Sequence, residues 1–206
     1  MRTSRLNTLR GGWPMRIGAA VAAILALTLS ACSTADYVTG SQASVLLIVA
    51  TINEGAVLDS DVRNGVDSTV VCPDTVSVAL AVRNKNPGAE APRIPGAVLI
   101  QRYQVQYSRS DGRAIEGVDV PYTIAGVLSS SVDVATSGTS EVPIEVVRRQ
   151  AKLDPPLSNI TGYDIVTMFA TITVSGQTVS GDTVTASGNM QIDFANFGDS
   201  EETCGS

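Results

Sequence analysis

The chain has 206 residues, of which 44% are hydrophobic and 17% are charged. This composition is typical of one globular domain and argues against disorder over most of the chain. All 20 acidic residues follow position 32, whereas four arginines precede it, so the remainder carries 10 basic residues and a formal charge of −10. Such a surface repels phosphate backbones and anionic headgroups, which argues against nucleic acid as a partner.

The first 31 residues have the pattern of a signal peptide. A basic stretch precedes an apolar run over 17–29, which at about 13 residues is shorter than the roughly 20 needed to span a hydrocarbon core. The run ends in Leu29-Ser30-Ala31-Cys32, which resembles the lipobox of bacterial lipoproteins. The resemblance implies that signal peptidase II recognises Leu29, Ser30 and Ala31 and cuts before Cys32.

The same resemblance implies a lipid anchor and a location in the cell. Cys32 would carry a diacylglyceryl group on its sulfur and an acyl chain on its new amino group, and we expect no other cofactor. Ser33 stands where an aspartate retains lipoproteins of Gram-negative bacteria at the inner membrane, so serine favours the outer membrane. We therefore expect an exported protein anchored to the cell envelope. The alternative is a plain signal peptide with an incidental cysteine.

The exported part divides into three segments. Residues 32–43 comprise the lipidated cysteine and a small, polar run that predicts a flexible tether with a coil span of about 20 Å. Residues 44–199 carry the strand patterns described below and should form one β domain. Residues 200–206 are a polar C-terminal tail.

Two cysteines remain besides Cys32. In an oxidising compartment Cys72 and Cys204 are the one possible intramolecular pair, and a bridge would tie the tail to the first half of the domain. Closing so long a loop constrains the unfolded chain by up to about 4–5 kcal/mol in the entropy model. Two unpaired thiols are the alternative. A zinc site is disfavoured because the chain has no histidine.

Alternation of polar and apolar side chains with period two predicts about eight strands. Near the end of the chain it places Met190, Ile192 and Phe194 on an inner face and Asn189, Gln191 and Asp193 on an outer one. The expected strands are 45–52, 76–82, 102–107, 122–124, 132–135, 141–146, 164–174 and 189–194.

Helix and turn signals complete the fold prediction. Residues 147–153 are the one helical candidate, and Asp154-Pro155-Pro156 should end it. Asp111-Gly112 suits a tight hairpin, whereas Gly176-Gln177 and Gly181-Asp182 compete for the last hairpin. About eight strands in about 160 residues favour an immunoglobulin-like Greek-key β-sandwich over a closed barrel.

Two further resemblances accompany this pattern. The runs 102–122, 149–152 and 192–199 resemble a set of bacterial exported lipoproteins that carry no established activity. The run 82–87, Val-Arg-Asn-Lys-Asn-Pro, is similar to the Asn-Pro-Asn motif that follows a strand in late-embryogenesis-abundant (LEA) domains of the water-stress and hypersensitive-response type. Here the motif is broken, and the resemblance implies a sandwich fold rather than a function.

The residue types present limit catalysis. Without histidine the chain lacks Ser-His-Asp and Cys-His arrangements, and its lysines, Lys85 and Lys152, do not lie in an S-x-x-K pattern. A pair of carboxylates could still serve a hydrolase. The candidate acids suit turns and surfaces better; they are Asp111, Glu116, Asp119 and Asp164.

Ligand sites can be weighed in the same way. An acidic segment could offer oxygen ligands to Ca²⁺, but its spacing differs from that of an EF-hand, and a solvated loop is the default; the candidate ligands are Asp59, Asp61, Asn64 and Asp67. Sugar binding lacks a tryptophan platform, because Trp13 leaves with the signal peptide. Tyr103 and Tyr107 share a strand face that we expect to be core.

The sequence thus predicts a non-catalytic interaction or structural module of the cell envelope, held at the membrane by its lipid and bound to an envelope protein of unspecified identity. Exposed strand edges or loops at one end of the sandwich would meet that partner. The alternative is a carboxylate-dependent hydrolase or a Ca²⁺-supported ligand-binding domain on the same fold.

Overall fold

The computed structural model describes residues 43–63, 71–85, 97–133, 139–161 and 163–197. The chain divides into two units, Met1–Gly40 and Ser41–Ser206, and all described residues belong to the second. The signal peptide with Leu29, Ser30 and Ala31, the anchor Cys32, and the tether up to residue 42 lie outside the described residues. So do Asn64 and Asp67 of the acidic segment and Cys204 of the expected bridge.

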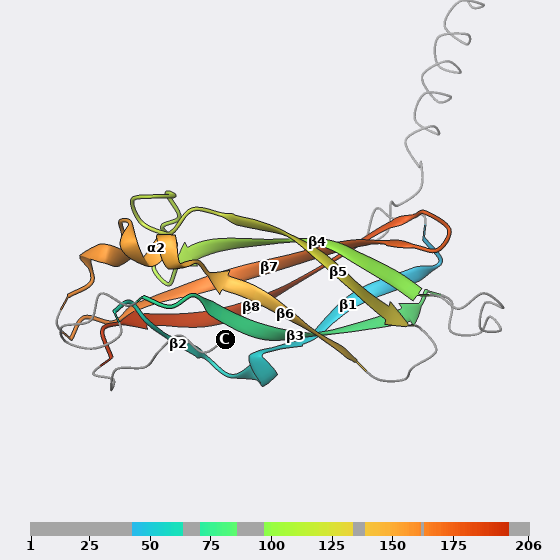
Figure 1. Ribbon diagram of the computed structural model, residues 1–206, viewed down its shortest axis with the longest axis horizontal. Helices are drawn as coiled ribbons and strands as arrows, with labels where there is room; N and C mark the ends of the chain where they lie inside the picture. The colour runs from blue at the N-terminus through green and yellow to red at the C-terminus, as the bar shows by residue number, and fades with distance from the viewer. Residues whose placement is uncertain (1–42, 64–70, 86–96, 134–138, 162, 198–206) are drawn as a thin grey trace, which may run out of the picture. The chain divides into compact units, whose positions relative to one another are not determined.

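Two β-sheets form the domain, as the sequence predicts (Figure 1). In the described residues the smaller sheet has the order β1-β3-β6, with β1 Val45–Ile52, β3 Asp74–Asn84 and β6 Ser140–Val147. The larger has the order β2-β8-β7-β4-β5, with β2 Leu58–Asp61, β8 Thr183–Ala195, β7 Val166–Thr178, β4 Ala97–Arg109 and β5 Ile124–Asp133. Neighbouring strands are antiparallel except β2, which runs parallel to β8.

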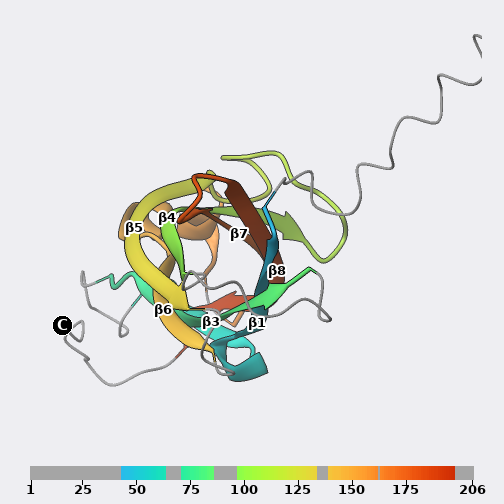
Figure 2. The same ribbon diagram turned by 90° about the vertical axis from the view of Figure 1, so that its right-hand side faces the viewer.

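The core lies between the two sheets, which Figure 2 shows nearly end-on. Along β7 and β8 the alternation is complete, and the predicted inner residues Met190, Ile192 and Phe194 are all buried. Tyr103 and Tyr107 of β4 are also in the core, as expected. The predicted all-β sandwich and the register of its last strand are therefore confirmed.

Strand β5 differs from its prediction. The expected strands 122–124 and 132–135 overlap the two ends of one ten-residue strand, Ile124–Asp133. Residues 122 and 123 precede this strand, and residues 134 and 135 lie outside the described part of the chain. The intervening residues are mostly small or polar, and several are exposed because β5 is an edge strand that pairs with β4 alone. An edge strand needs little apolar alternation, so this segment gave no strand signal.

Strand β2 corrects the expectation of a solvated acidic loop. Leu58–Asp61 pairs with β8 from Ile192 to Ala195, so Asp59 and Asp61 belong to a strand. Ser60 is fully buried between them, and its hydroxyl donates to a carboxylate of β3. The sequence Leu-Asp-Ser-Asp forms a strand because its backbone groups find partners on β8, a long-range pairing that local patterning does not reveal.

The helix and the turns follow the sequence more closely. Helix α2, Arg149–Leu153, begins and ends within the predicted 147–153, and the short helices η1, Asn53–Gly55, and η2, Leu157–Asn159, accompany it. The last hairpin uses Gly181, whose φ of +90° favours glycine. Gly112 also has a positive φ, but its turn opens a long loop, 110–123, instead of joining β4 directly to β5.

Replacing Ile192 by Asp should lower the free energy of unfolding by about 3 kcal/mol or more, because it buries an unpaired charge on the inner face of β8. Asn189→Asp, on the exposed face of the same strand, should change it by less than about 0.5 kcal/mol. Gln191 is a less suitable control, since its amide donates to Asp193. Urea unfolding compares the two variants, and equal losses would mean that the register is wrong.

Candidate functional site at the α2 end of the sandwich

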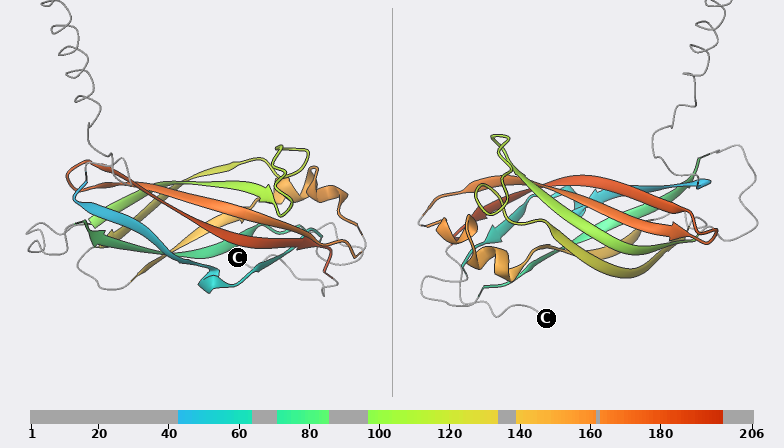
Figure 3. Two further views of the ribbon diagram at one scale, coloured as in Figure 1. Left: turned by 180° about the vertical axis from the view of Figure 1, so that it is seen from behind. Right: turned by 90° about the horizontal axis from the view of Figure 1, so that it is seen from above.

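Helix α2 and the start of β1 lie at opposite ends of the sandwich (Figures 1 and 3). One end of β3 pairs with Val45, the first residue of β1, and the other pairs with Val147, two residues before α2. The 11 residues of β3 therefore separate the two ends by about 33 Å. We call the loop 110–123, helix α2 and the residues that follow it up to 165 the α2 end.

A buried lysine joins both sheets at the α2 end. The side chain of Lys152 is 1% exposed, and its ammonium lies 3.0 Å from a carboxylate oxygen of Asp74. It also donates to the backbone carbonyl of Asp61 at 2.7 Å, while the hydroxyl of Ser60 donates to Asp74 at 2.6 Å. Because β2 belongs to the larger sheet and β3 to the smaller one, this network fastens α2 to both.

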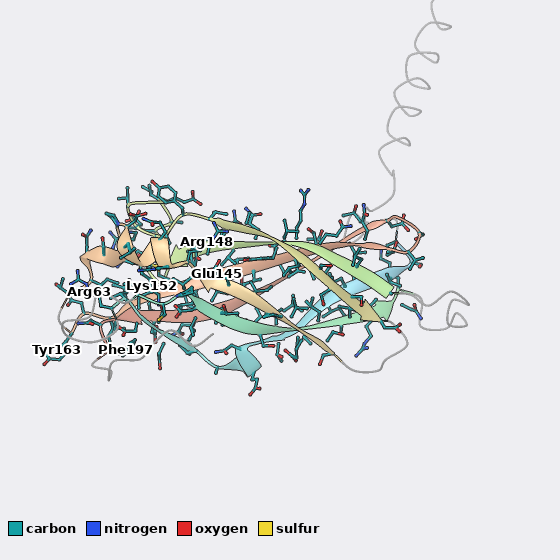
Figure 4. The ribbon with its side chains drawn as sticks, in the orientation of Figure 1. Arg63, Glu145, Arg148, Lys152, Tyr163 and Phe197 are labelled. Carbon is teal, nitrogen blue, oxygen red and sulfur yellow. The ribbon has the colours of Figure 1, made fainter. Side chains whose placement is uncertain are left out.

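Two further side chains cross between the sheets nearby. The buried hydroxyl of Tyr107, on β4, donates to the backbone carbonyl of Val146 on β6. Burial raises the pKa of this hydroxyl, so it stays protonated and can donate. Arg148, beyond β6, donates to the backbone carbonyl of Ala125 on β5 at 2.8 Å and lies 3.4 Å from Glu145. Figure 4 labels Lys152, Arg148 and Glu145 at this end.

Ser60, Asp74 and Lys152 include a hydroxyl, a carboxylate and an amine within hydrogen-bonding distance. A nucleophile must nevertheless reach its substrate, and both Ser60 and Lys152 are buried. Their polar atoms are already engaged, because both donate to Asp74 and Lys152 also donates to the carbonyl of Asp61. A buried, fully hydrogen-bonded ion pair of this kind holds elements in place. The geometry therefore gives the cluster a positioning role in the fold.

The loop 110–123 is held by its own charges. Arg113 donates to Asp111 at 2.6 and 2.9 Å, and Arg109 lies 3.4 Å from the same carboxylate. The hydrogen bonds from Arg113 lower the pKa of Asp111 to about 2, so the carboxylate stays ionised in any ordinary medium. Asp119 lies 3.6 Å from Arg113, which links the two halves of the loop.

The two remaining candidate acids of the hydrolase hypothesis, Glu116 and Asp164, have different surroundings. Glu116 accepts hydrogen bonds from the backbone and hydroxyl of Thr123, within the same loop. Asp164 lines a separate hollow beside Arg109 and Asn159. The contacts of Asp111, Glu116 and Asp119 thus fix the structure of their own loop.

The acidic segment on β2 also lacks a metal centre in the part that is visible. No group of three or more His, Cys, Asp or Glu residues that could hold a metal ion occurs among the described residues. Asp61 accepts a hydrogen bond from the backbone of Arg63 at 3.1 Å, a local turn contact. Asn64 and Asp67 lie outside this region, so the calcium hypothesis stays an untested alternative.

Several large apolar side chains are exposed to solvent at the α2 end. The loop 110–123 exposes three large ones, α2 exposes one and the following segment two: Ile115, Val118, Tyr122, Leu153, Tyr163 and Ile165. Figure 4 shows Tyr163 reaching outward there. At the other end of the described sandwich the exposed large apolar residues are two, Leu99 near the start of β4 and Val179 in the last hairpin. Exposed apolar residues are thus more numerous at the α2 end, and an excess of this kind is a feature of interaction sites.

A hollow of about 150 Å³ lies between this loop and α2. Its wall is mostly apolar and includes Pro121, Tyr122 and Ala151, while Arg148 and Gln150 add polar groups. The sequence did not reveal this arrangement, because Tyr122 was assigned to a strand. The five-residue helix gave no signal of which face would be exposed.

Comparisons with known proteins give few relatives. No protein-family model matches the chain, and no curated protein matches it. A solution structure described as that of a late embryogenesis abundant (LEA) protein is 16% identical, covers 88% of this chain and 83% of its own, and has a TM-score of 0.38. No helix among the described residues has the length and apolar character needed to cross a membrane.

Replacing Lys152 by Met should lower the free energy of unfolding by about 3 kcal/mol, because Asp74 loses the partner that compensates its burial. Arg149→Met, on the exposed side of the same helix, should change it by less than about 0.5 kcal/mol. Chemical denaturation of the two variants provides the comparison. Similar small losses in both would show that the buried network does not hold this end together.

The bridge between Cys72 and Cys204 stays a prediction, since Cys204 lies outside the described residues. Cys72 lies two residues before β3 and is part-buried. We expect non-reducing mass spectrometry of the exported protein to show one peptide pair containing both cysteines. Cys204→Ser should then lower the melting temperature while the sandwich still folds, because the strands supply the core. Complete alkylation of both thiols in unreduced protein would contradict the bridge.

Proposed function

We propose that this chain is an exported lipoprotein, anchored through Cys32, whose sandwich is a non-catalytic interaction module of the cell envelope. The observation that carries the proposal is that six exposed large apolar side chains lie on the elements of the α2 end. The proposed tether joins the domain before Val45, at the opposite end. The α2 end is therefore the end of the domain farther from this junction.

The chemistry of the α2 end suits a protein partner. Protein interfaces have an apolar centre rich in aromatic residues and a polar rim, and here Tyr122 and Leu153 are bordered by Arg149, Glu116 and the Arg113–Asp111 pair. The hollow beside Tyr122 can take an aliphatic side chain of the partner. We infer that the partner is an envelope protein. A domain anchored in the outer membrane, the location that Ser33 favours, could reach such a protein.

The anchor is tested by Cys32→Ala, which should abolish palmitate labelling and release the protein from the membrane fraction, because the acyl chains supply the membrane affinity. Leu153→Ala at the far end is the matched control and should leave both unchanged. Recovery of the Cys32→Ala protein in carbonate-washed membranes would contradict the lipid anchor.

The interaction surface is tested by photo-crosslinking in the native host with a crosslinking amino acid at Tyr122 or Leu153. The control position is Val179, which is equally exposed but lies at the opposite end. We expect the same envelope protein to be captured from Tyr122 and Leu153 and not from Val179. Capture of the same proteins from all three positions, or none from the α2 end, would contradict the proposal.

A further inference from the structure

The outer face of the larger sheet is nearly free of charge. Its side chains on the three inner strands β4, β7 and β8 alternate with the buried ones and are mostly hydroxyls and amides. Arg102 and Asp193 are the charged members; the set is Leu99, Gln101, Arg102, Gln104, Gln106, Ser108, Thr167, Phe169, Thr171, Thr173, Ser175, Gln177, Thr183, Thr185, Ser187, Asn189, Gln191 and Asp193. An exposed protein surface ordinarily carries far more charge.

Register arranges these groups in rows across the sheet. One row is Gln106–Thr171–Asn189, and the next is Gln104–Thr173–Ser187. Each step between strands is about 4.8 Å, so hydroxyl and amide groups repeat at short, regular intervals. Thr173 and Ser187 are themselves 2.9 Å apart, and the amide residues of the two rows, Gln104, Gln106 and Asn189, are exposed. The face thus offers many donors and acceptors and few charges.

One aromatic ring stands among these rows. Phe169 is 41% exposed and lies between Ser108 and Gln191 in register. A water-exposed phenyl ring presents an apolar face on which the C–H groups of a sugar ring can stack. Tyr103 and Tyr107, which share a face of β4, are both core residues. Phe169 supplies the ring that they do not.

The face ends in a hollow of about 330 Å³ where the loop 110–123 folds over it. Its floor is made by Gln106, Ser108 and Thr171 of the face, and its wall by Glu116 and Thr123 of the loop. The volume is in the range of small-ligand sites, and the mixed polar lining suits hydroxyl groups. By register, Phe169 borders this hollow, because Ser108 pairs with it and Thr171 lies two residues along the same strand face.

We propose that this face, with its hollow, binds an uncharged glycan chain. The exported part carries a formal charge of −10, so polyanions are repelled, while a polycation would find few carboxylates here, namely Asp193 on the face and Glu116 beside the hollow. A chain of neutral, hydroxyl-rich sugar rings matches the rows of amides, the exposed ring and the low density of charge. The hollow shares the loop 110–123 with the α2 end, but the ligand is a glycan rather than a protein, so the inference goes beyond the proposed function.

The test uses the lipidated protein in detergent and two probes that share a backbone: soluble oligosaccharides of chitin, which are uncharged, and of chitosan, which are cationic. Cellulose oligosaccharides are a second neutral probe, and polygalacturonate is a polyanion. Calorimetric titration measures each affinity. We expect binding to a neutral glycan and at least tenfold weaker binding to polygalacturonate and chitosan.

Three variants place the site. Phe169→Ala removes the ring and Gln106→Glu adds a charge to the hollow at nearly constant shape, and each should weaken neutral-glycan binding at least tenfold. Thr51→Glu, at an exposed position of the smaller sheet, should leave it unchanged. Unaltered melting temperatures show that the variants fold. The inference is overturned if the protein binds neither neutral glycan, or if Phe169→Ala and Gln106→Glu bind as tightly as the unmodified protein. The crosslinking result at the α2 end stands independently.

Discussion

The fold depends on one constraint: every second side chain of β4, β7 and β8 has to be apolar and face the smaller sheet. Ile172, Val174 and Ile192 are completely buried, and each is flanked by polar residues on the opposite face. A slip of one residue would send this entire set into water and bring its polar neighbours into the core. The same constraint therefore creates both the core and the neutral outer face.

The α2 end is organised differently, because helix α2 and strand β2, to which it is bonded, bury few apolar residues. Strand β2 has four residues and helix α2 has five, which are too short to hold their places by local preference. Lys152 compensates by bonding to Asp61 and Asp74, which lie on different sheets. The position of the loop, the helix and the hollow between them thus rests on an ion pair that forms only once both sheets have assembled.

The sequence was informative where structure is local or strictly periodic. Strand β1 has the bounds that alternation predicts, and the inner residues of β8 are as expected. It was silent where partners are distant in sequence: β2 owes its conformation to β8, more than 120 residues away, and the burial of Lys152 depends on acceptors 78 and 91 residues earlier. A lysine on a short polar helix ordinarily indicates an exposed position.

The candidate surfaces show the same division. The alternation with period two predicted that Gln191 and Asn189 face outward. It did not predict that they lie beside uncharged residues of β4 and β7, because only the register between the strands brings these residues together on one face. The exposed ring of Phe169 was likewise hidden in the apolar run Met-Phe-Ala, where alternation alone does not say which residue faces water. Surfaces assembled from several strands become visible only in the folded chain.

The central claim is that the long strands have one dry and one wet face, and a single-cysteine scan of β7 tests it most directly. Each position from 167 to 175 is replaced in turn, and its reaction with a polar thiol reagent is read peptide by peptide by mass spectrometry. The account predicts fast labelling at the odd-numbered positions and protection at the even-numbered ones. Uniform labelling, or a pattern shifted by one residue, would contradict the register on which the core and the neutral face both depend.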